Sequence, residues 1–150
     1  MFGTVINRFM VQASIGKPLL VYGQGEQIRT FLNINDTLQC VELAVKNPAK
    51  KNEYKVRNQF TEVFTIKNLA YLVQKSAKKI GINPKIKFIK NPRNESQGHH
   101  FNPSNKSFLK LGLKPRKLNP NFILENMKKI LVNKDNIDLR VLSPKIKWKN

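Results

Sequence analysis

Two arginines stand at positions where their chemistry could be used. Arg29 follows the glycine-containing stretch YGQGEQ and opens an apolar run, and Arg93 follows another apolar run in the loop NPRNESQGHHFNPSN. Lysine is the common basic residue in this chain, and a guanidinium group can bind two phosphate oxygens at once where an ammonium group cannot. The pattern indicates two arginines that could bind one diphosphate. The alternative, that both are ordinary surface charges, stays open on this pattern alone.

The glycine turn beside Arg29 is not expected to bind a dinucleotide. Gly23 and Gly25 begin a possible fingerprint, but Ile28 stands where the third glycine belongs. An apolar strand is expected next, whereas a dinucleotide site needs a helix that presents its N-terminus to the pyrophosphate. The stretch therefore predicts a hairpin turn between two short strands.

Two other patterns are weak candidates for catalysis or metal binding. Tyr71 and Lys75 have the spacing of the tyrosine and lysine pair in short-chain dehydrogenases, but helical sequences often produce this spacing by chance. His99 and His100 are adjacent, and no cysteine or acidic cluster lies close in sequence to complete a metal site. We therefore predict no catalytic residue and no metal ion in this chain.

The charge of the chain supports an alternative function. Its 28 lysines and arginines oppose 9 acidic residues, which gives a formal net charge of +19 and a pI near 10.3. Such an excess suggests nucleic acid, an anionic surface or an anionic ligand, although a biased coding composition would also produce it. No nucleic-acid-binding motif is recognised, and few aromatic residues lie among the basic ones. A small basic module that binds RNA or DNA stays as the alternative.

The chemistry has to be positioned by short strands that alternate with helices, which predicts the α/β or α+β class. The length and apolar content favour a single domain over residues 1–150. Asp36 is expected to cap a helix, Glu62 to lie in a turn, and Cys40 to be a small core residue. The expected helices are 2–15, 36–47, 65–79, 104–113 and 119–134, and the expected strands are 18–23, 30–35, 53–60 and 85–91.

The sequence also restricts where the protein is expected to lie. No run approaches the roughly 18 apolar residues of a membrane span, and the opening stretch MFGTVINRFMVQASIG lacks the features of a signal peptide. Cys40 is the only cysteine, so a reducing compartment is the simpler assumption. We expect no membrane partner, and a location in the cytoplasm, or in the plastid stroma if the source is a photosynthetic eukaryote.

Several separated motifs resemble one enzyme superfamily. The stretches GKPLLVYGQGEQIRTFLNINDTLQCVELAVKNP and NPRNESQGHHFNPSNKSFLKLGLKP are similar to the substrate-binding half of extended short-chain dehydrogenase/reductases, the NAD-dependent epimerase/dehydratase family. Within it, FGTVINRFMVQASIGKPL, NQFTE and the terminal P.I.WK resemble the UDP-sulfoquinovose synthase family. The resemblance covers essentially the whole chain. It implies the C-terminal portion of the fold, without the Rossmann half.

The resemblance also implies a set of substrate-binding residues. Arg29 and Arg93 match the two arginines that contact the nucleotide diphosphate, and open backbone groups of the nearby strand would meet the base or ribose. The matching residues around the base and ribose are Leu20, Val21, Tyr22 and Gln27. Further pocket candidates are Thr4, Asn7, Arg8, Asn58, Gln59, Glu95 and His99. His100 departs from the pattern, because an aromatic hydroxyl is expected there.

The chain lacks several motifs that the resemblance would require of a complete enzyme. The whole enzyme, by resemblance, uses NAD to oxidise UDP-glucose transiently, eliminates water, adds sulfite and reduces the product to UDP-sulfoquinovose, a sulfolipid precursor. The glycine fingerprint and catalytic tyrosine and lysine pair of that enzyme have no match here. We therefore expect a fragment or split gene product that binds UDP-glucose or a related UDP-sugar, binds no NAD and is inactive alone. A separate Rossmann subunit could dock on Phe2, Val5 and Phe9.

Overall fold

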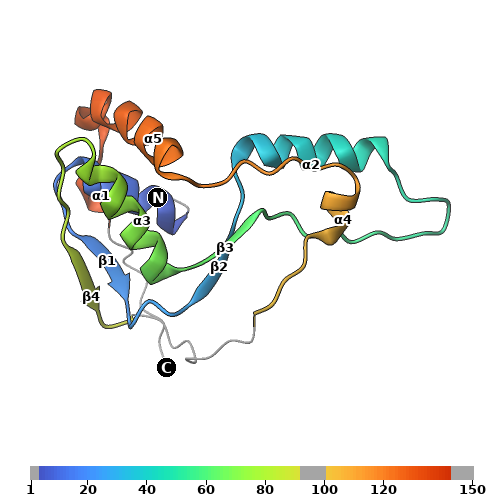
Figure 1. The fold of residues 1–150 in the computed structure, drawn as a ribbon, viewed down its shortest axis with the longest axis horizontal. Helices are drawn as coiled ribbons and strands as arrows, with labels where there is room; N and C mark the ends of the chain where they lie inside the picture. The colour runs from blue at the N-terminus through green and yellow to red at the C-terminus, as the bar shows by residue number, and fades with distance from the viewer. Residues whose placement is uncertain (1–3, 92–100, 143–150) are drawn as a thin grey trace. The chain divides into compact units, whose positions relative to one another are not determined.

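The structure is a computed structural model that describes residues 4–91 and 101–142 (Figure 1). Short strands alternate with helices, which confirms the α/β class. The strands are β1 (Leu19–Tyr22), β2 (Ile28–Phe31), β3 (Glu62–Thr65) and β4 (Ile86–Ile89). The helices are α1 (Val5–Ser14), α2 (Ile34–Lys46), α3 (Ile66–Lys78), α4 (Lys106–Lys110) and α5 (Pro120–Val132), followed by 3-10 turns at Lys134–Asn136 and Leu139–Val141.

The chain divides into two compact units, each built from segments that are distant in sequence. The first unit comprises Met1–Gln27, Thr65–His99 and Asn119–Asn150, and the second comprises Ile28–Phe64 and His100–Leu118. The first contains the sheet β1-β4, and the second contains the sheet β2-β3. The sequence predicts one sugar-nucleotide-binding domain over residues 1–150. A division into two compact units does not test whether they bind the ligand as one domain, so this stays a prediction.

In the first unit, α1, α3 and α5 pack against one another, and α1 and α3 also contact β1 (Figure 1). The helices turn apolar side chains inward at three- and four-residue intervals, as the sequence pattern predicts. The fully buried side chains include Phe9, Leu69, Val73, Ile123 and Met127.

The prediction that Phe9 belongs to a docking surface on the first helix is wrong. Its side chain is 0% exposed, because the α1 face that carries it packs inside the first unit. Val5 is half-buried, and Phe2 lies outside the described residues. A partner could not reach Phe9 without opening this core.

In the second unit, α2 packs against α4 and the chain that follows it. Cys40, with Leu43 and Ala44 beside it, contacts a small cluster formed by Phe108, Leu111 and Leu113. The core position expected for Cys40 is confirmed, since the side chain is 0% exposed.

The hairpin prediction for the glycine turn is wrong. β1 pairs with β4 in parallel, and β2 pairs with β3 instead of β1. The carbonyl oxygens of Gly25 and Gln27 accept hydrogen bonds from the N–H groups of Lys67 and Ile66, at 2.9 and 3.1 Å. These bonds attach the turn to the start of α3, a tertiary contact that the local sequence does not reveal.

The start of α2 also differs from the prediction. Asn33 is the N-cap, and its Oδ1 accepts a hydrogen bond from the N–H of Asn35 at 3.0 Å. Asp36, the predicted cap, lies inside the helix and is fully buried. Residues 53–60 form no strand, and Glu62, the predicted turn residue, lies on β3. No helix in the described ranges is long and apolar enough to cross a membrane.

Candidate functional site

The parallel pairing of β1 and β4 places their carboxyl ends side by side, at what we call the carboxyl edge of the sheet. Tyr22 lies opposite Ile89 at the carboxyl ends of the two strands, and the N–H of Gly23 donates to the carbonyl of Ile89 at 2.8 Å. The glycine turn and residues 90–91 therefore leave the sheet at the same edge. Ligands of α/β proteins commonly bind beyond the carboxyl ends of parallel strands.

The glycine turn is held closely, and Gly25 is the position where glycine is required. Gly25 has a φ of +74°, and a Cβ built there would lie 2.7 Å from Cγ1 of Val21. Gln27 closes the turn, because its Nε2 donates a hydrogen bond to the carbonyl of Tyr22 at 3.2 Å. The turn thus has a fixed backbone shape at the edge of the sheet.

Arg8 reaches this edge from α1. The centre of its guanidinium lies 4.9 Å from the ring centroid of Tyr22, a distance at which a cation is attracted to an aromatic face. Its Nη1 donates to the hydroxyl of Tyr22 at 3.4 Å, and its Nη2 donates to the carbonyl of Leu20 at 3.3 Å. Four predicted residues, namely Arg8, Leu20, Tyr22 and Gln27, are therefore neighbours in the first unit.

The sequence predicts that backbone groups of β1 are open to a ligand, but both backbone groups of Leu20 already form hydrogen bonds with side chains. Its carbonyl accepts from Arg8, and its N–H donates to Oε1 of Gln12 at 3.3 Å. Gln12 is only 2% exposed, and sequence reasoning missed it because one polar residue in FMVQAS gives no sign of its target. The side chain of Val21 is fully buried, so it can contribute only backbone groups.

The remaining predicted residues fall in several places. Arg29 lies on β2 in the second unit, where its Nη1 donates to the carbonyl of Ile28 at 2.9 Å. Asn58 donates to the carbonyl of Ser104 at 3.0 Å. The exposed candidates are Thr4 and Asn7 in the first unit and Asn58 and Gln59 in the second. Arg93, Glu95 and His99 lie outside the described residues, as does His100.

Sequence reasoning also missed three side chains that hold one basic segment in the second unit. Oδ2 of Asp36 accepts from the N–H of Arg116 at 2.8 Å, and Oε2 of Glu62 accepts from the N–H of Leu118 at 2.5 Å. Gln39 both donates to and accepts from the backbone of Lys114. The backbone of 114–118 is fixed in this way, while the side chains of Lys114, Arg116 and Lys117 are exposed.

The glycine turn does not fit a dinucleotide site, and the described residues form no metal-binding cluster. The glycine turn leads into β2, so it does not place a helix N-terminus where a pyrophosphate would lie. Within the described ranges, no group of three or more His, Cys, Asp or Glu side chains could hold a metal ion. Burial raises the pKa of the Cys40 thiol, and the charge of Asp36 adds to the rise, so Cys40 is a poor nucleophile.

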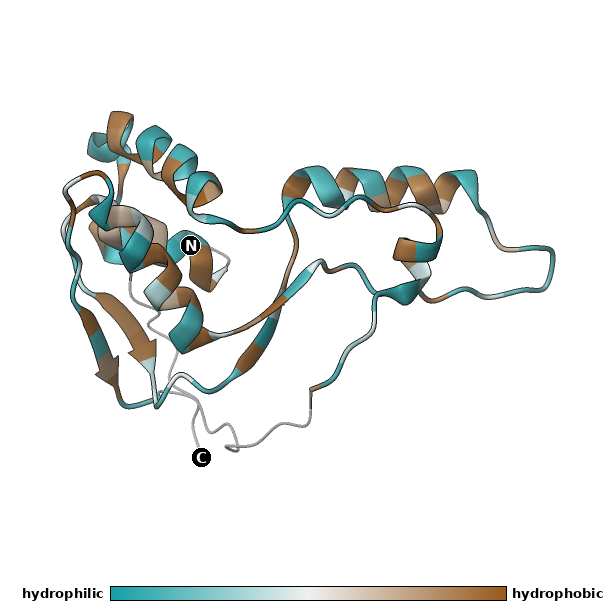
Figure 2. Cartoon of the chain, in the orientation of Figure 1, coloured by the Kyte–Doolittle hydropathy of each residue, from teal (hydrophilic) through white to brown (hydrophobic). Residues whose placement is uncertain are grey.

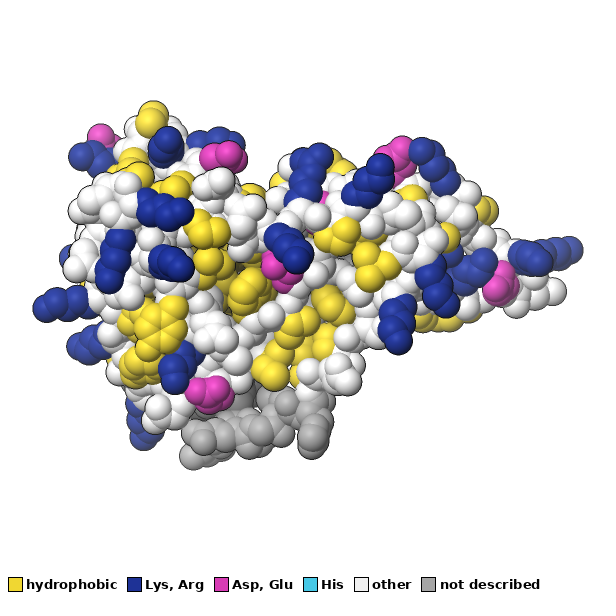
Figure 3. All heavy atoms as spheres, viewed as in Figure 1, with side chains coloured by type: hydrophobic (Ala, Val, Ile, Leu, Met, Phe, Trp, Pro, Cys, Tyr) yellow, Lys and Arg dark blue, Asp and Glu magenta, His cyan; other side chains and the backbone are white. Residues whose placement is uncertain are grey.

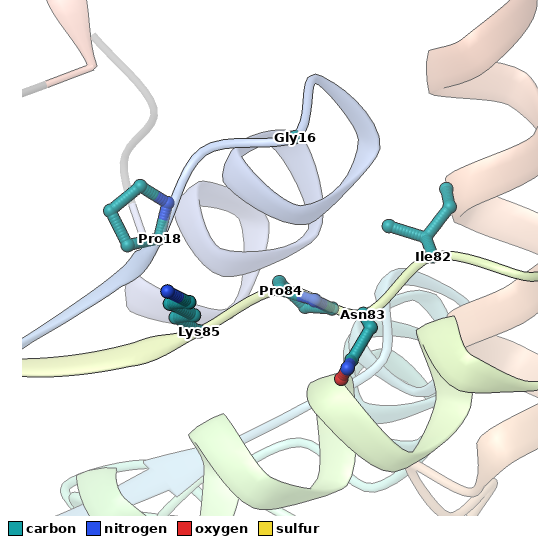
Figure 4. Close-up of a pocket in the computed structure, with 6 residues that line it drawn as sticks. All are labelled: Gly16, Pro18, Ile82, Asn83, Pro84 and Lys85. Atoms are coloured by element: carbon teal, nitrogen blue, oxygen red, sulfur yellow. The ribbon is translucent and has the colours of Figure 1, made fainter.

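A shallow hollow lies at the opposite end of the first sheet (Figure 4). Its lining residues precede the two strands, and they are Gly16, Pro18, Ile82, Asn83, Pro84 and Lys85. Lys85 is its single charged side chain, so the hollow lacks the paired cations that a diphosphate would need. The carboxyl edge therefore remains the better candidate for a nucleotide site.

The chain matches curated proteins over almost its whole length. UDP-sulfoquinovose synthase, chloroplastic, from Spinacia oleracea is 44% identical over 148 residues, which are 99% of this chain and 31% of the spinach protein. The chain is related to UDP-sulfoquinovose synthases. The synthase of that name from Sulfolobus acidocaldarius is 39% identical over 150 residues, which are 99% of this chain and 38% of that protein. The chain thus spans about a third of the length of these synthases, and no family model matches it.

Solved structures show that the fold is shared with UDP-sugar epimerases. A UDP-N-acetylglucosamine 4-epimerase from Methanobrevibacter ruminantium, in complex with UDP-N-acetylmuramic acid, has a TM-score of 0.68 at 19% identity and covers 87% of this chain and 40% of its own. A UDP-glucose 4-epimerase from Thermotoga maritima, with UDP-glucose, has a TM-score of 0.67 at 18% identity and covers 89% and 40%. A UDP-glucuronic acid 4-epimerase from Bacillus cereus, in complex with UDP-glucuronic acid and NAD, has a TM-score of 0.63 at 21% identity and covers 85% and 40%.

Proposed function

We propose that this chain is the C-terminal, UDP-sugar-binding portion of a UDP-sulfoquinovose synthase-like enzyme. The complete enzyme would convert UDP-glucose and sulfite into UDP-sulfoquinovose for sulfolipid synthesis. The observation that carries the proposal is the 44% and 39% identity to two synthases over 99% of the chain. The likeness in fold to epimerases solved with UDP-sugars supports the same ligand class.

On this proposal the chain binds substrate but does not turn it over alone. The reaction requires a redox cofactor, and the glycine turn of this chain does not fit the pyrophosphate of NAD, which at least one epimerase of the same fold binds. A separate Rossmann portion would supply the cofactor and the catalytic tyrosine and lysine. The purified chain should therefore show no NAD-dependent consumption of UDP-glucose in the presence of sulfite.

Each proposed contact follows from the chemistry of its residue. Arg29 and Arg93 would bind the diphosphate, because two planar guanidinium groups match its oxygens. The edge formed by Leu20–Tyr22, with Gln27 beside it, would meet the base or ribose. Arg8 already donates to the carbonyl of Leu20, so a base that used this carbonyl would replace the Arg8 contact. The weaker pocket candidates stay as proposed: Thr4, Asn7, Asn58, Gln59, Glu95 and His99.

The test compares two charge-preserving double variants. Arg29→Lys with Arg93→Lys keeps the net charge but removes both planar groups, so we expect UDP-glucose affinity to fall at least about tenfold, or 1.4 kcal/mol. Lys145→Arg with Lys147→Arg is the matched control and should leave the affinity nearly unchanged. Equal affinities for both double variants, measured by calorimetric titration, would reject the arginine clamp.

The location of the protein follows the same proposal. The spinach synthase is named as chloroplastic, and we propose the plastid stroma for a photosynthetic eukaryotic source and the cytoplasm otherwise. Binding to RNA or DNA stays as the alternative function, because the net charge of +19 would favour any polyanion.

A further inference from the structure

Helix α2 carries apolar side chains on two opposite sides. One side packs inside the second unit through Cys40 and its neighbours Leu43 and Ala44. The other side carries four large apolar residues that are exposed: Ile34 at 70%, Leu38 at 63%, Val41 at 50% and Val45 at 73%. Figure 2 shows hydrophobic residues recurring along the length of α2.

These four side chains form a continuous stripe, which we call the α2 stripe. They are spaced by four, three and four residues, so at 3.6 residues per turn they fall within an arc of roughly 60°. Single exposed apolar residues need no explanation, but an aligned row of them indicates a surface that another molecule covers. The α2 stripe therefore calls for a partner.

The loop after α2 places basic residues next to the end of the α2 stripe. Nη2 of Arg57 donates to the carbonyl of Asn47 at 2.8 Å, and Nζ of Lys55 donates to that of Pro48 at 3.3 Å, so the loop is attached to the end of the helix. Lys50 and Lys51 in this loop are exposed, as are the apolar side chains of Tyr54 and Val56. Figure 3 shows that basic side chains greatly outnumber acidic ones on the visible face.

Two observations identify the partner. A second copy of this chain would oppose one charge of +19 with another, which disfavours self-association. In the spinach and Sulfolobus synthases the matched region is joined to a larger part, since it fills only 31% and 38% of their lengths. An apolar surface with an acidic rim on that larger part would complement both the α2 stripe and its basic border.

We propose that the α2 stripe is the docking surface for the larger portion of a UDP-sulfoquinovose synthase, the portion that this chain does not match. The contact joins Leu38 and Val41, at the centre of the stripe, to apolar side chains of that portion. The basic loop at 50–57 would face acidic side chains of that portion. The inference rests on the proposed function, because it assumes that the chain works together with that portion.

The test uses a chimera in which this chain replaces the matching region of the Sulfolobus acidocaldarius synthase. Leu38→Glu with Val41→Glu alters the α2 stripe, and Val132→Glu with Leu139→Glu alters two exposed apolar residues of the first unit as a matched control. In the chain alone, both double variants should leave the melting temperature nearly unchanged. In the chimera, the variant of the α2 stripe should lower it by at least about 3 °C more than the control.

Thiol labelling gives a second measurement that does not rely on a destabilising change. Val41→Cys should react with a maleimide at least tenfold more slowly in the chimera than in the chain alone, whereas Val132→Cys should react alike in both. Native Cys40 is fully buried, so the introduced thiol dominates the signal in the chain alone. Equal labelling rates at position 41 in the two contexts would overturn the proposal. So would a dimer of the chain alone that Leu38→Glu with Val41→Glu separates.

A UDP-glucose titration separates this proposal from the proposed function. A chimera that protects position 41 but binds no UDP-glucose would reject the function and keep the docking surface. A chimera that binds UDP-glucose but leaves position 41 unprotected would reject the docking surface alone.

Discussion

At the residue scale, buried and half-buried polar side chains hold the backbone of β1 and of the basic segment 114–118. Gln12 and Arg8 occupy the backbone groups of Leu20, and Asp36 holds the N–H of Arg116 while its side chain is fully buried. A buried carboxylate that accepts two hydrogen bonds is costly to alter, because its donors lose their partner away from water. Gln12 and Asp36 act through structure and were not predicted as substrate-binding residues, whereas Arg8 was a pocket candidate.

Asp36→Asn should destabilise the chain markedly. The carboxylate accepts from the N–H of Arg116 at 2.8 Å and from Nε2 of Gln39 at 3.1 Å, and an amide offers one acceptor oxygen in place of two. We expect a loss of about 1–3 kcal/mol in the free energy of unfolding, measured by urea denaturation. Glu42→Gln removes only an exposed pair with Lys46 and should leave the free energy of unfolding nearly unchanged. Equal losses for the two variants would contradict the structural role of Asp36.

At the element scale, the glycine turn and the strand before it form the most sharply shaped part of the candidate site. The turn contains Gly23 and Gly25, both with positive φ, but the space around them differs. Alanine at Gly23 would meet no atom closer than 3.7 Å, whereas alanine at Gly25 would contact Val21 and the backbone of Lys67. Alanine at Gly23 would therefore report backbone strain alone, whereas alanine at Gly25 would report strain together with steric overlap.

Gly25→Ala should cost clearly more stability than Gly23→Ala. Each substitution places a Cβ in the left-handed region, which costs about 1–2 kcal/mol. At Gly25 the new Cβ would also lie 2.7 Å from the buried Val21 side chain and 3.1 Å from the backbone nitrogen of Lys67. Urea denaturation of both variants gives the comparison. Indistinguishable midpoints would mean that the turn is not attached to α3 in solution.

Elements with a strong period were predictable from sequence, and those set by distant contacts were not. α3 matches its apolar pattern, and the Thr65 side chain caps it by accepting from the N–H of Asn68 at 3.1 Å. The predicted strand at 53–60 is a loop, because alternating residues do not form a strand without a pairing partner. The pairing of β1 with β4 also depends on residues far apart in the chain, so local pattern could not reveal it.

At the scale of the whole molecule, the predicted substrate-binding residues are divided between two compact units of a strongly basic chain. Arg29 and Arg93 were candidates from their chemistry and position, and the other candidates came from the resemblance. The structure brings Arg8, Leu20, Tyr22 and Gln27 together in the first unit. Arg29 belongs to the second unit, and Arg93 lies outside the described residues. The proposal that Arg29 and Arg93 bind one diphosphate is therefore tested by measuring UDP-glucose affinity.

The most direct test is calorimetric titration of the purified chain with UDP-glucose, and separately with a short mixed-sequence RNA, at moderate and high salt. We predict saturable binding of UDP-glucose that Arg29→Ala abolishes, because a guanidinium fork on the diphosphate is the main specific contact. RNA should bind weakly, and only at the lower salt concentration. RNA binding with a steep salt dependence and no UDP-glucose signal would contradict the account and favour a basic nucleic-acid-binding module.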